Sequence, residues 1–376
     1  MKQGWEYKKL GEVCEVVTGT TPRTNIPEYW GKGHYWVTPA ELTDTTVYVD
    51  KTERQITDEA LDKTKLRLLP IGTVLLSSRA PIGKVAITNI EMYCNQGFKN
   101  CICSDSINNK YLFYFLRLKK DFLNSLGRGA TFKEISKSIV ENIKLPLPPK
   151  STQLAIVSEL DKINELIRLK KEQLKDFDNL AQSIFYEMFG DPVENEMGWE
   201  VKKLVEVSSL INGRAYKQNE LLNEGKYKVL RVGNFFTNSN YYYSNLELDD
   251  EKYCYKGDLL FAWSASFGAF IWDEGKTIFH YHIWRVLFDE KNLNIYYYKY
   301  LLNTMTNFFM NDVHGIGMVH LTKAGMEQYN LPLPPLPLQH LFAQRIEQIE
   351  HQKAEVQKSI ADLETLLASR MQYWFE

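Results

Sequence analysis

The sequence has few cysteines and no long hydrophobic run. Its 5 cysteines are an odd number among 376 residues and are scattered along the chain, unlike the framework of a disulfide-stapled secreted domain. The segment Met1–Glu6 holds no apolar stretch typical of an export signal. The uncharged stretch Leu259–Trp272 has 14 residues, too few to cross a bilayer. We therefore expect a reduced, cytoplasmic protein with no membrane role.

The chain also lacks a strong excess of charge. It has 45 basic and 47 acidic residues, a formal net charge of -2, so global charge neither requires nor excludes a polyanionic partner. Residues 1–150 carry 22 basic and 16 acidic residues, whereas residues 191–335 carry 14 and 18. An acidic second part disfavours phosphate contacts unless its basic residues gather on one face.

Several catalytic and cofactor motifs are missing. There is no phosphate-binding Gly-x-x-x-x-Gly-Lys loop and no Asn/Asp-Pro-Pro-Tyr/Phe motif of adenine methyltransferases. Gly315–Gly317 lacks the third glycine of a dinucleotide loop. Cys94, Cys101 and Cys103 have no fourth ligand at a zinc-type spacing. We expect no metal and no cofactor in this chain.

One pattern resembles a nuclease site. Glu200 and Lys202 follow Asp191 by nine and eleven residues, as an acidic pair and a lysine do in many nucleases. Glu6 and Lys8 repeat the Glu-x-Lys pattern without an upstream aspartate. A duplicated structural strand is the better interpretation.

The sequence contains a tandem repeat. Gly4–Leu10 recurs as Gly198–Leu204, and Leu145–Pro149 recurs as Leu331–Pro335, at offsets of 194 and 186. Two intermediate matches keep the same order: Gly72–Leu76 with Gly257–Phe261, and Tyr111–Leu116 with Tyr297–Leu302. A unit of roughly 190 residues is therefore present twice.

Each repeat has two parts. Residues 1–149 and 191–335 mix short β-rich runs with turns, and each holds a helical stretch, at about 108–124 and 292–310. Residues 150–190 and 336–376 follow the Leu-Pro-Leu-Pro-Pro segment and have the pattern of long helices. The expected fold class is α+β, with two duplicated domains of mixed α/β structure and two long helices.

The two helices show the same heptad register. The first spans about 48 Å from Ile156 to Met188 at about 1.5 Å per residue. Matching registers predict one coiled coil, and the short link between Gly190 and Gly198 favours an antiparallel, pseudo-two-fold arrangement. The predicted core positions are Ile156, Leu160, Ile163, Ile167, Lys170, Leu174, Phe177, Ala181, Ile184 and Met188 in the first helix, and Phe342, Ile346, Ile349, Lys353, Val356, Ile360, Leu363, Leu367, Arg370 and Trp374 in the second.

This organisation resembles the specificity subunit of Type I restriction–modification systems. The most specific feature is Leu-Pro-Leu-Pro-Pro followed by a coiled-coil helix, present twice in order. Smaller matches are Trp36–Pro39, Leu75–Gly83 and Asn95–Phe98 in the first copy, and Leu230–Asn234 and Phe267–Gly268 in the second. Where the family has Glu-Gln at the helix start, this chain has Thr152-Gln153 and Leu338-Gln339.

The resemblance implies a non-catalytic subunit with two target-recognition domains, each reading half of a bipartite sequence in double-stranded DNA. The helices would space the two domains and dock two methyltransferase subunits, which carry S-adenosylmethionine and methylate adenine N6. Restriction subunits, which use ATP and Mg²⁺, can join such complexes. Apolar residues expected on the outer helix faces would suit partner docking or, for some of them, contact with the globular parts: Leu154, Leu166, Phe185 and Leu341.

Candidate DNA contacts are side chains with the donors and acceptors that base edges and phosphates require. In the first domain these are Arg23, Arg79, Lys84, Asn95, Gln96, Lys99 and Arg128. In the second they are Arg214, Lys217, Arg231, Asn234, Trp263, Ser264, His280, His282, Arg285 and His314.

Two alternatives stay open at this point. A single-chain nuclease or methylase would carry its own catalytic site, and a scaffold would bind proteins only. The tyrosines at 296–298 are expected in a helix core, whereas those at 241–243 could stack on bases. We interpret the charged core positions as residues that set the register of the coiled coil or contact partner subunits; they are Lys170, Lys353 and Arg370.

Overall fold

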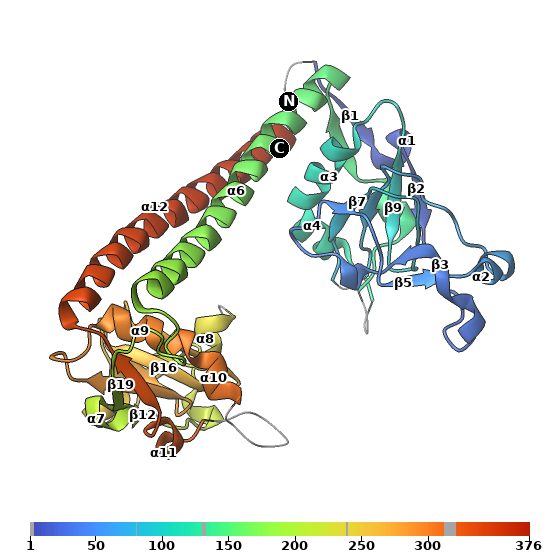
Figure 1. Cartoon of the computed structure of the whole chain (residues 1–376). Coiled ribbons are helices and arrows are strands. Elements are labelled where there is room, and N and C mark those ends of the chain that lie inside the picture. The colour runs from blue at the N-terminus through green and yellow to red at the C-terminus, as the bar shows by residue number, and fades with distance from the viewer. Residues whose placement is uncertain (1–3, 80, 130–132, 238–239, 312–320) are drawn as a thin grey trace. The chain divides into compact units, whose positions relative to one another are not determined.

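The computed structural model describes residues 4–79, 81–129, 133–237, 240–311 and 321–376 (Figure 1). The chain divides into two compact units. Unit 1 comprises Met1–Lys171 with Ser359–Glu376, and unit 2 comprises Glu172–Lys358. The division falls within both long helices, so each unit contains one globular domain and parts of both helices.

The globular part of unit 1 contains a two-stranded sheet, β1-β10, and two larger sheets. The five-stranded sheet has the order β2-β9-β6-β7-β4, and the three-stranded sheet has the order β5-β3-β8. The strands are β1 (Glu6–Lys9), β2 (Cys14–Thr18), β3 (Trp30–Val37), β4 (Tyr48–Val49), β5 (Arg54–Ile56), β6 (Val74–Leu76), β7 (Val85–Thr88), β8 (Tyr93–Cys94), β9 (Lys99–Cys103) and β10 (Lys144–Leu147). The helices are α1 (Leu10–Val13), α2 (Asp58–Lys63), α3 (Asn109–Leu118), α4 (Lys120–Leu126) and α5 (Lys137–Glu141), with short 3-10 turns η1 (Pro27–Tyr29) and η2 (Pro39–Glu41).

Unit 2 likewise contains a two-stranded sheet, β11-β20, and two larger sheets. Their orders are β12-β19-β16-β17 and β14-β13-β18-β15. The strands are β11 (Glu200–Lys203), β12 (Ser208–Asn212), β13 (Tyr227–Leu230), β14 (Tyr242–Ser244), β15 (Tyr253–Cys254), β16 (Leu259–Ser264), β17 (Ser266–Ile271), β18 (Thr277–Phe279), β19 (Ile283–Phe288) and β20 (Asn330–Leu333). The helices are α7 (Leu204–Val207), α8 (Val232–Phe236), α9 (Ile295–Thr304), α10 (Thr306–Asn311) and α11 (Lys323–Met326), with 3-10 turns η3 (Gln218–Glu220) and η4 (Asp250–Lys252).

The repeated sequence segments have the same structural role in both units. β1 pairs with β10 from Glu6↔Leu147 onward, and β11 pairs with β20 from Glu200↔Leu333 onward, in the same antiparallel register. The Gly-Trp-Glu segment that begins each repeat thus forms a ladder with the Leu-Pro-Leu-Pro segment that ends it. This pairing closes each globular domain at the start of its long helix.

An amphipathic helix fills the core of each globular domain. Asn108 caps α3 by accepting from the Tyr111 N–H at 3.0 Å, and Asn294 likewise caps α9. Tyr111 and Tyr297 are fully buried, as are most apolar side chains around them. Tyr297 and Tyr298 therefore belong to the core, as predicted, whereas Tyr296 is half-buried. The Tyr297 ring packs on Phe185 and Phe189 of the first long helix, and Tyr298 Oη is hydrogen-bonded to Ser208 Oγ of β12.

The two long helices are antiparallel in each unit, and the predicted α+β fold class is confirmed. They are α6 (Lys150–Phe189) and α12 (Leu336–Phe375) (Figure 1). In unit 1 Glu159 bonds to Arg370, and Lys171 bonds to Glu364 at 2.7 Å. In unit 2 Asp178 bonds to Lys353 at 2.8 Å, and the Phe185 and Phe342 rings lie 5.8 Å apart. Residue numbers rise on one helix as they fall on the other.

The predicted heptad positions face the interior. Ile156, Leu160, Ile163, Ile167, Ala181, Phe342, Ile346, Ile349, Val356 and Ile360 are buried, and the other ten are half-buried. The polar positions Lys353 and Arg370 hold the ion pairs just described, which fits a register role. Within the described ranges, no helix has the length and apolarity needed to span a membrane.

One predicted surface residue is in the core. Phe185 was expected on an outer helix face but is fully buried. It stacks on Tyr297 at 5.8 Å and packs against Phe189 and Phe342. Helix α6 buries one face against α12 and an adjacent face against the globular domain. The heptad pattern predicts only the face that packs against α12.

Candidate nucleic-acid interface

Four loops of unit 1 meet at one end of its sheets. They follow β2, β3, β6 and β8, and backbone hydrogen bonds tie them together. Thr20 N donates to Cys94 O at 2.9 Å, Asn95 N to Val37 O at 3.1 Å, and Ser78 N to Gly97 O at 2.7 Å. The loops therefore form one continuous surface, although they are far apart in the sequence.

The corresponding loops of unit 2 meet in the same way. They follow β12, β13, β16 and β18. Arg214 N donates to Phe279 O at 3.1 Å, His280 N to Leu230 O at 2.8 Å, and Trp263 N to His282 O at 3.1 Å. The repeat thus preserves the loop cluster even where its side chains differ.

In each group of loops, one glycine allows another backbone segment to pass very close to its Cα. A Cβ added at Gly19 would collide with the backbone oxygen of Asn95, and one at Gly213 would collide with those of Phe279 and His280. Glycine is required at both places because another backbone passes directly against its Cα. We call the two groups of loops reading cluster 1 (residues 19–21, 38–41, 77–79, 81–84 and 95–97) and reading cluster 2 (213–217, 231–234, 263–266 and 280–282).

Reading cluster 1 holds basic residues around one carboxylate. Glu134 bonds to Arg79 Nε at 2.9 Å and to Lys99 Nζ at 3.0 Å, and its backbone pairs with Arg128. Burial alone would raise the pKa of Glu134, but the bonds from Lys99 and Arg79 lower it below its ordinary value. The arrangement fixes the Arg79 side chain and the backbone of Arg128 at the edge of the cluster, and both residues are exposed.

The other predicted residues of unit 1 lie in or beside this cluster. Lys84 Nζ donates to Pro39 O at 3.1 Å, Asn95 Oδ1 accepts from the Gly97 N–H at 2.9 Å, and Gln96 is hydrogen-bonded to Thr21. Arg23 is exposed on the segment after β2. These contacts place amide and cationic groups together at one sheet end.

Reading cluster 2 contains an arginine held by a bidentate ion pair. Arg214 Nη1 and Nη2 bond to the two carboxylate oxygens of Glu220 at 3.0 and 2.8 Å, and the guanidinium lies 5.2 Å from the Tyr216 ring centroid. The bonds from Arg214 and from the Lys217 backbone lower the pKa of Glu220 to about 2. Lys217 itself is exposed beside this pair.

Arg231 is held by a ring instead of a carboxylate. Its guanidinium lies 4.5 Å from the Tyr242 ring centroid, and its backbone N–H donates to Asn234 Oδ1 at 2.8 Å. Tyr242 comes from the tyrosine run that was left open between stacking and packing. Here it supports an arginine, so Asn234 and Tyr242 both orient Arg231.

Two histidines complete the second cluster. The His280 and His282 rings lie 4.9 Å apart, and His282 is 5.1 Å from Trp263. Burial, with the nearby charges of His282 and Arg231, lowers the pKa of His280 to about 4, so its imidazole is neutral at pH 7. Its Nδ1 accepts from the His282 backbone N–H at 3.3 Å, which leaves Nε2 carrying the proton.

Several predicted contacts are corrected by burial. Lys99, Trp263 and Ser264 are 5, 7 and 1% exposed, so they support the loops from beneath rather than reach a ligand. Arg285 donates to Tyr253 O at 2.9 Å, away from the cluster. His314 and the Gly315–Gly317 motif lie outside the described residues.

Sequence reasoning missed the groups that orient the arginines. Glu134 and Glu220 were not singled out because a search for base and phosphate contacts favours cations and amides. A usable signal was present at Glu220, which lies six residues after Arg214 at the end of a short polar turn. Tyr281, 45% exposed between the two histidines, was also passed over.

The residues considered for other chemistry have structural places. Glu200 and Lys202 lie on β11 and form an ion pair at 3.5 Å, as Glu6 and Lys8 do on β1 at 3.1 Å. Cys94 is buried, which raises its thiol pKa to about 12. The described residues contain no cluster of three or more His, Cys, Asp or Glu side chains that could hold a metal ion.

Each unit also has a hollow where its sheet meets the start of a long helix. The hollow in unit 2 measures about 510 Å³ and is lined by Leu287, Phe288 and His340 among others. Its counterpart in unit 1 measures about 360 Å³, with Ile71 and Cys103 in the lining. Ile71 is 64% and Leu287 is 44% exposed. The repeat therefore presents the same concave feature twice.

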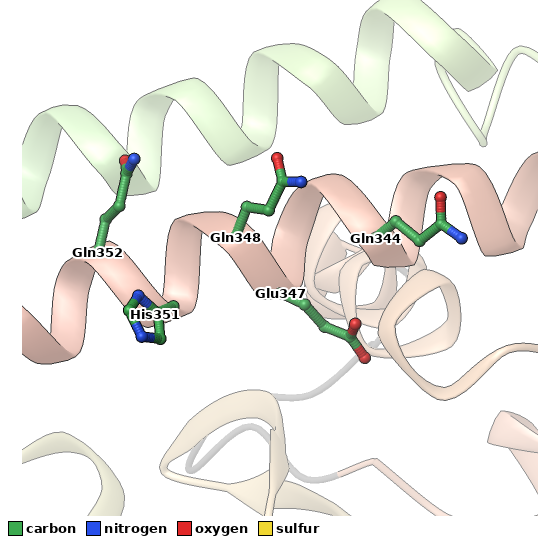
Figure 2. A pocket seen from close by; sticks show the side chains of 5 residues that line it. All are labelled: Gln344, Glu347, Gln348, His351 and Gln352. Carbon is green, nitrogen blue, oxygen red and sulfur yellow. The ribbon is translucent and has the colours of Figure 1, made fainter.

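The outer faces of the long helices are partly apolar. Leu154, Leu166 and Leu341 are exposed, as expected, and Leu180 and Leu366 are exposed at equivalent positions of the repeat. On α12 a polar stretch borders a further surface hollow. Figure 2 shows its lining side chains along the helix: Gln344, Glu347, Gln348, His351 and Gln352.

Comparisons with known proteins agree on one family. The family model described as the Type I restriction modification DNA specificity domain matches residues 2–176 and 196–365. The chain is 29% identical to the Type I restriction enzyme MjaIX specificity subunit of Methanocaldococcus jannaschii, over 96% of this chain and 90% of that one. It is 30% identical to the EcoR124I/EcoR124II specificity subunit of Escherichia coli, over 43% of this chain and 41% of that one.

Solved structures support the same fold. A chain from a study of complex assembly and conformational transition of the type I R-M system aligns with a TM-score of 0.62 at 19% identity, covering 99% of this chain and 97% of that chain. The S subunit of a Type I restriction–modification system from M. genitalium aligns with a TM-score of 0.52 at 14% identity, covering 99% and 96%.

Proposed function

Because the chain belongs to the family of Type I restriction–modification DNA specificity subunits, we propose that reading clusters 1 and 2 each recognise one half of a bipartite DNA target. The observation that carries the proposal is the repetition of the loop cluster. Both units bring the loops after equivalent strands to one place, while the side chains on those loops differ. Because the two loop clusters have the same backbone arrangement but different side chains, they suit recognition of two half-sites that differ in sequence.

The chemistry of the clusters fits reading of the DNA major groove. Arginine can bond to guanine O6 and N7 in a bidentate way, and asparagine or glutamine can bond to adenine N6 and N7. Arg79, Asn95 and Gln96 supply these groups in cluster 1, and Arg214 and Arg231 supply them in cluster 2. The neutral His280 supplies a donor without adding a charge. Arg128 and Lys217 are exposed nearby, where phosphates would lie.

The excess of acidic over basic residues in the second domain, 18 against 14, is not changed when they pair with one another, so DNA binding depends on where the unpaired cations lie. Glu220 is engaged by Arg214, and in the same way Glu274 is bonded to Lys228 and Glu247 to Lys226. These acidic side chains neutralise cations of the unit itself. Lys217 and Arg231 are not among the ion-paired cations of the described residues, so these two are the cations that cluster 2 offers to DNA.

We propose further that the chain is the non-catalytic member of its complex and docks two methyltransferase subunits. Those subunits would bind S-adenosylmethionine and methylate adenine N6, and restriction subunits that use ATP and Mg²⁺ could join. Two equivalent hollows, each with an exposed apolar residue, suit two copies of one partner. The exposed pair Leu180 and Leu366 repeats in the same way.

Reconstitution with the methyltransferase tests this proposal. The chain and the methyltransferase together should transfer methyl groups to DNA carrying the bipartite target, and native mass spectrometry should find two methyltransferases per chain. Ile71→Asp and Leu287→Asp should each prevent one of the two methyltransferase subunits from binding, because docking would bury the new carboxylate against the apolar surface of that subunit. Leu68→Asp, at an exposed leucine outside both hollows, is the matched control.

Two results would contradict the proposal. If both hollow variants kept two methyltransferases per chain, docking at the hollows would be wrong. If the purified chain alone cut or methylated DNA, and Glu200→Ala abolished that activity, the chain would carry its own catalytic site.

A further inference from the structure

A buried glutamine joins each globular domain to its long helix. Gln153 and Gln339 lie on the first turns of α6 and α12 and are both 0% exposed. Gln153 Oε1 accepts from the Asn108 N–H at 2.8 Å, and its Nε2 donates to Ser106 O at 3.0 Å and Pro148 O at 2.9 Å. Both amide N–H donors and the amide oxygen are therefore used.

The second copy repeats these bonds one by one. Gln339 Oε1 accepts from the Asn294 N–H at 2.8 Å, and its Nε2 donates to Asn292 O at 2.9 Å and Pro334 O at 2.8 Å. The glutamines are separated by 186 residues, the same offset as the Leu-Pro-Leu-Pro-Pro segments.

Each glutamine connects three segments of its unit. These are the turn that caps α3 or α9, the proline segment after β10 or β20, and the first turn of the long helix. A tyrosine adds a second connection: Tyr111 Oη donates to Pro146 O at 2.8 Å, and Tyr297 Oη to Pro332 O at 2.9 Å. Because the prolines also fix their own φ angles, the junction has little freedom to bend.

The junction and the reading cluster lie at opposite ends of the same strand. β9 begins at Lys99, beside cluster 1, and ends at Cys103, three residues before Ser106; β19 begins directly after His282 of cluster 2 and ends at Phe288, four residues before Asn292. A strand of six residues spans about 17 Å at about 3.4 Å per residue. If the reading cluster lies about 20 Å from the junction, a tilt of the globular domain by about 10° moves the cluster by about 3.5 Å. This shift is close to the rise of about 3.4 Å per base pair.

We propose that Gln153 and Gln339 are positioning residues that fix the tilt of each globular domain on its helix, and thereby fix the number of unread base pairs between the two half-sites. The inference rests on the proposed function, since it assigns the junction a role in reading a split target. This role explains why each junction contains a glutamine with all its hydrogen bonds made, although an apolar side chain would fill the same buried space.

The test is methylation mapping in a host that carries the chain with its methyltransferase. Gln339→Met keeps the length of the side chain but removes all three hydrogen bonds, and Gln153→Met does the same in unit 1. Each variant should keep both half-site sequences but methylate targets whose spacers are one base pair shorter or longer, at a tenth or more of the level at the original spacer. Wild type should methylate one spacer length.

Two further variants separate positioning from folding. Gln182→Leu removes a glutamine bond from α6 to Thr304, at 2.9 Å, outside the junction, and should leave a single spacer length. Tyr297→Phe keeps the ring but removes the bond to Pro332, so it loosens the junction even if Gln339→Met does not accumulate. It should broaden the spacer to a smaller extent.

The outcomes are distinct. If Gln339→Met, Gln153→Met and Tyr297→Phe all methylate only the original spacer, at any level, the positioning role is wrong and the glutamines only stabilise the fold. If Gln182→Leu broadens the spacer as much as they do, the effect is not specific to the junction. If wild type gives no bipartite motif at all, the proposed function itself fails, whatever the variants do.

Discussion

At the scale of residues, acidic and aromatic side chains determine where the basic ones lie. Glu134 holds Arg79 and Lys99, Glu220 holds Arg214, and Tyr242 lies under Arg231. Fixing a long side chain before binding reduces the conformational entropy lost on contact with a base edge. The sequence identified the arginines through their donor chemistry, but their partners depend on contacts between distant segments, which local patterns do not report.

The Glu134 cluster predicts a pH-dependent stability. Glu134→Gln leaves Lys99 buried without its counter-charge, so we expect it to lower the free energy of unfolding by about 3 kcal/mol at pH 7. Because the folded-state pKa of Glu134 is lowered, its contribution is present above the ordinary carboxylate pKa and is lost as pH falls through the folded-state value. The difference between variant and wild type should therefore shrink below about pH 4.

Urea unfolding measured from pH 7 to pH 3 checks this prediction. Glu15→Gln is the matched control, since Glu15 pairs with Arg67 on the surface at 3.1 Å, and it should cost less than about 0.5 kcal/mol. An equal loss in both variants, or a Glu134→Gln effect that does not change with pH, would contradict the account.

At the scale of elements, periodicity predicted the helices well and the sheets poorly. The heptad positions identified both helices and their buried faces, because a 4-3 spacing holds along each helix. The loops that form the reading clusters could not be assembled in this way. Gly19 and Gly213 signal a close backbone approach only once the strands that bring Cys94 and Phe279 beside them are known.

The antiparallel pairing of α6 and α12 predicts how the target spacer changes with helix length. We expect deletion of 167–173 from α6 together with 357–363 from α12 to shorten the tolerated spacer by at most about three base pairs, since a heptad rises about 10 Å and a base pair about 3.4 Å. The half-site sequences should not change, because no residue of either reading cluster is altered.

Methylation mapping of the double deletion measures the new spacer. Deleting only 167–173 is the control, and it should abolish methylation because the partner helix no longer matches in length. A double deletion that methylates the original spacer would show that the helices do not set the distance.

At the scale of the whole molecule, the repeat is the feature that both sequence and structure emphasise. The duplication was evident from segments such as Gly4–Leu10 and Gly198–Leu204, and family membership followed from their order. The antiparallel pairing predicted from the heptads implies that each domain lies beside the end of the other repeat's helix, and the two compact units show this exchange. That exchange depends on which helix faces pack together, as Phe185 and Phe342 do in unit 2.

The central claim is that two independent readers share one chain. The most direct test is genome-wide adenine methylation mapping in a host with the methyltransferase and either the wild-type chain, no chain, Arg79→Ala or Arg231→Ala. Arg67→Ala, at an exposed arginine outside both clusters, serves as the control. Each lost base contact should cost about 1–3 kcal/mol of discrimination, roughly 5- to 150-fold at one base.

We predict a split motif that disappears without the chain. Arg79→Ala should relax one half-site and Arg231→Ala the other, while Arg67→Ala should leave both intact. Methylation that is unchanged without the chain would contradict its role in specificity, and equal losses at both half-sites in either arginine variant would contradict the independence of the two readers.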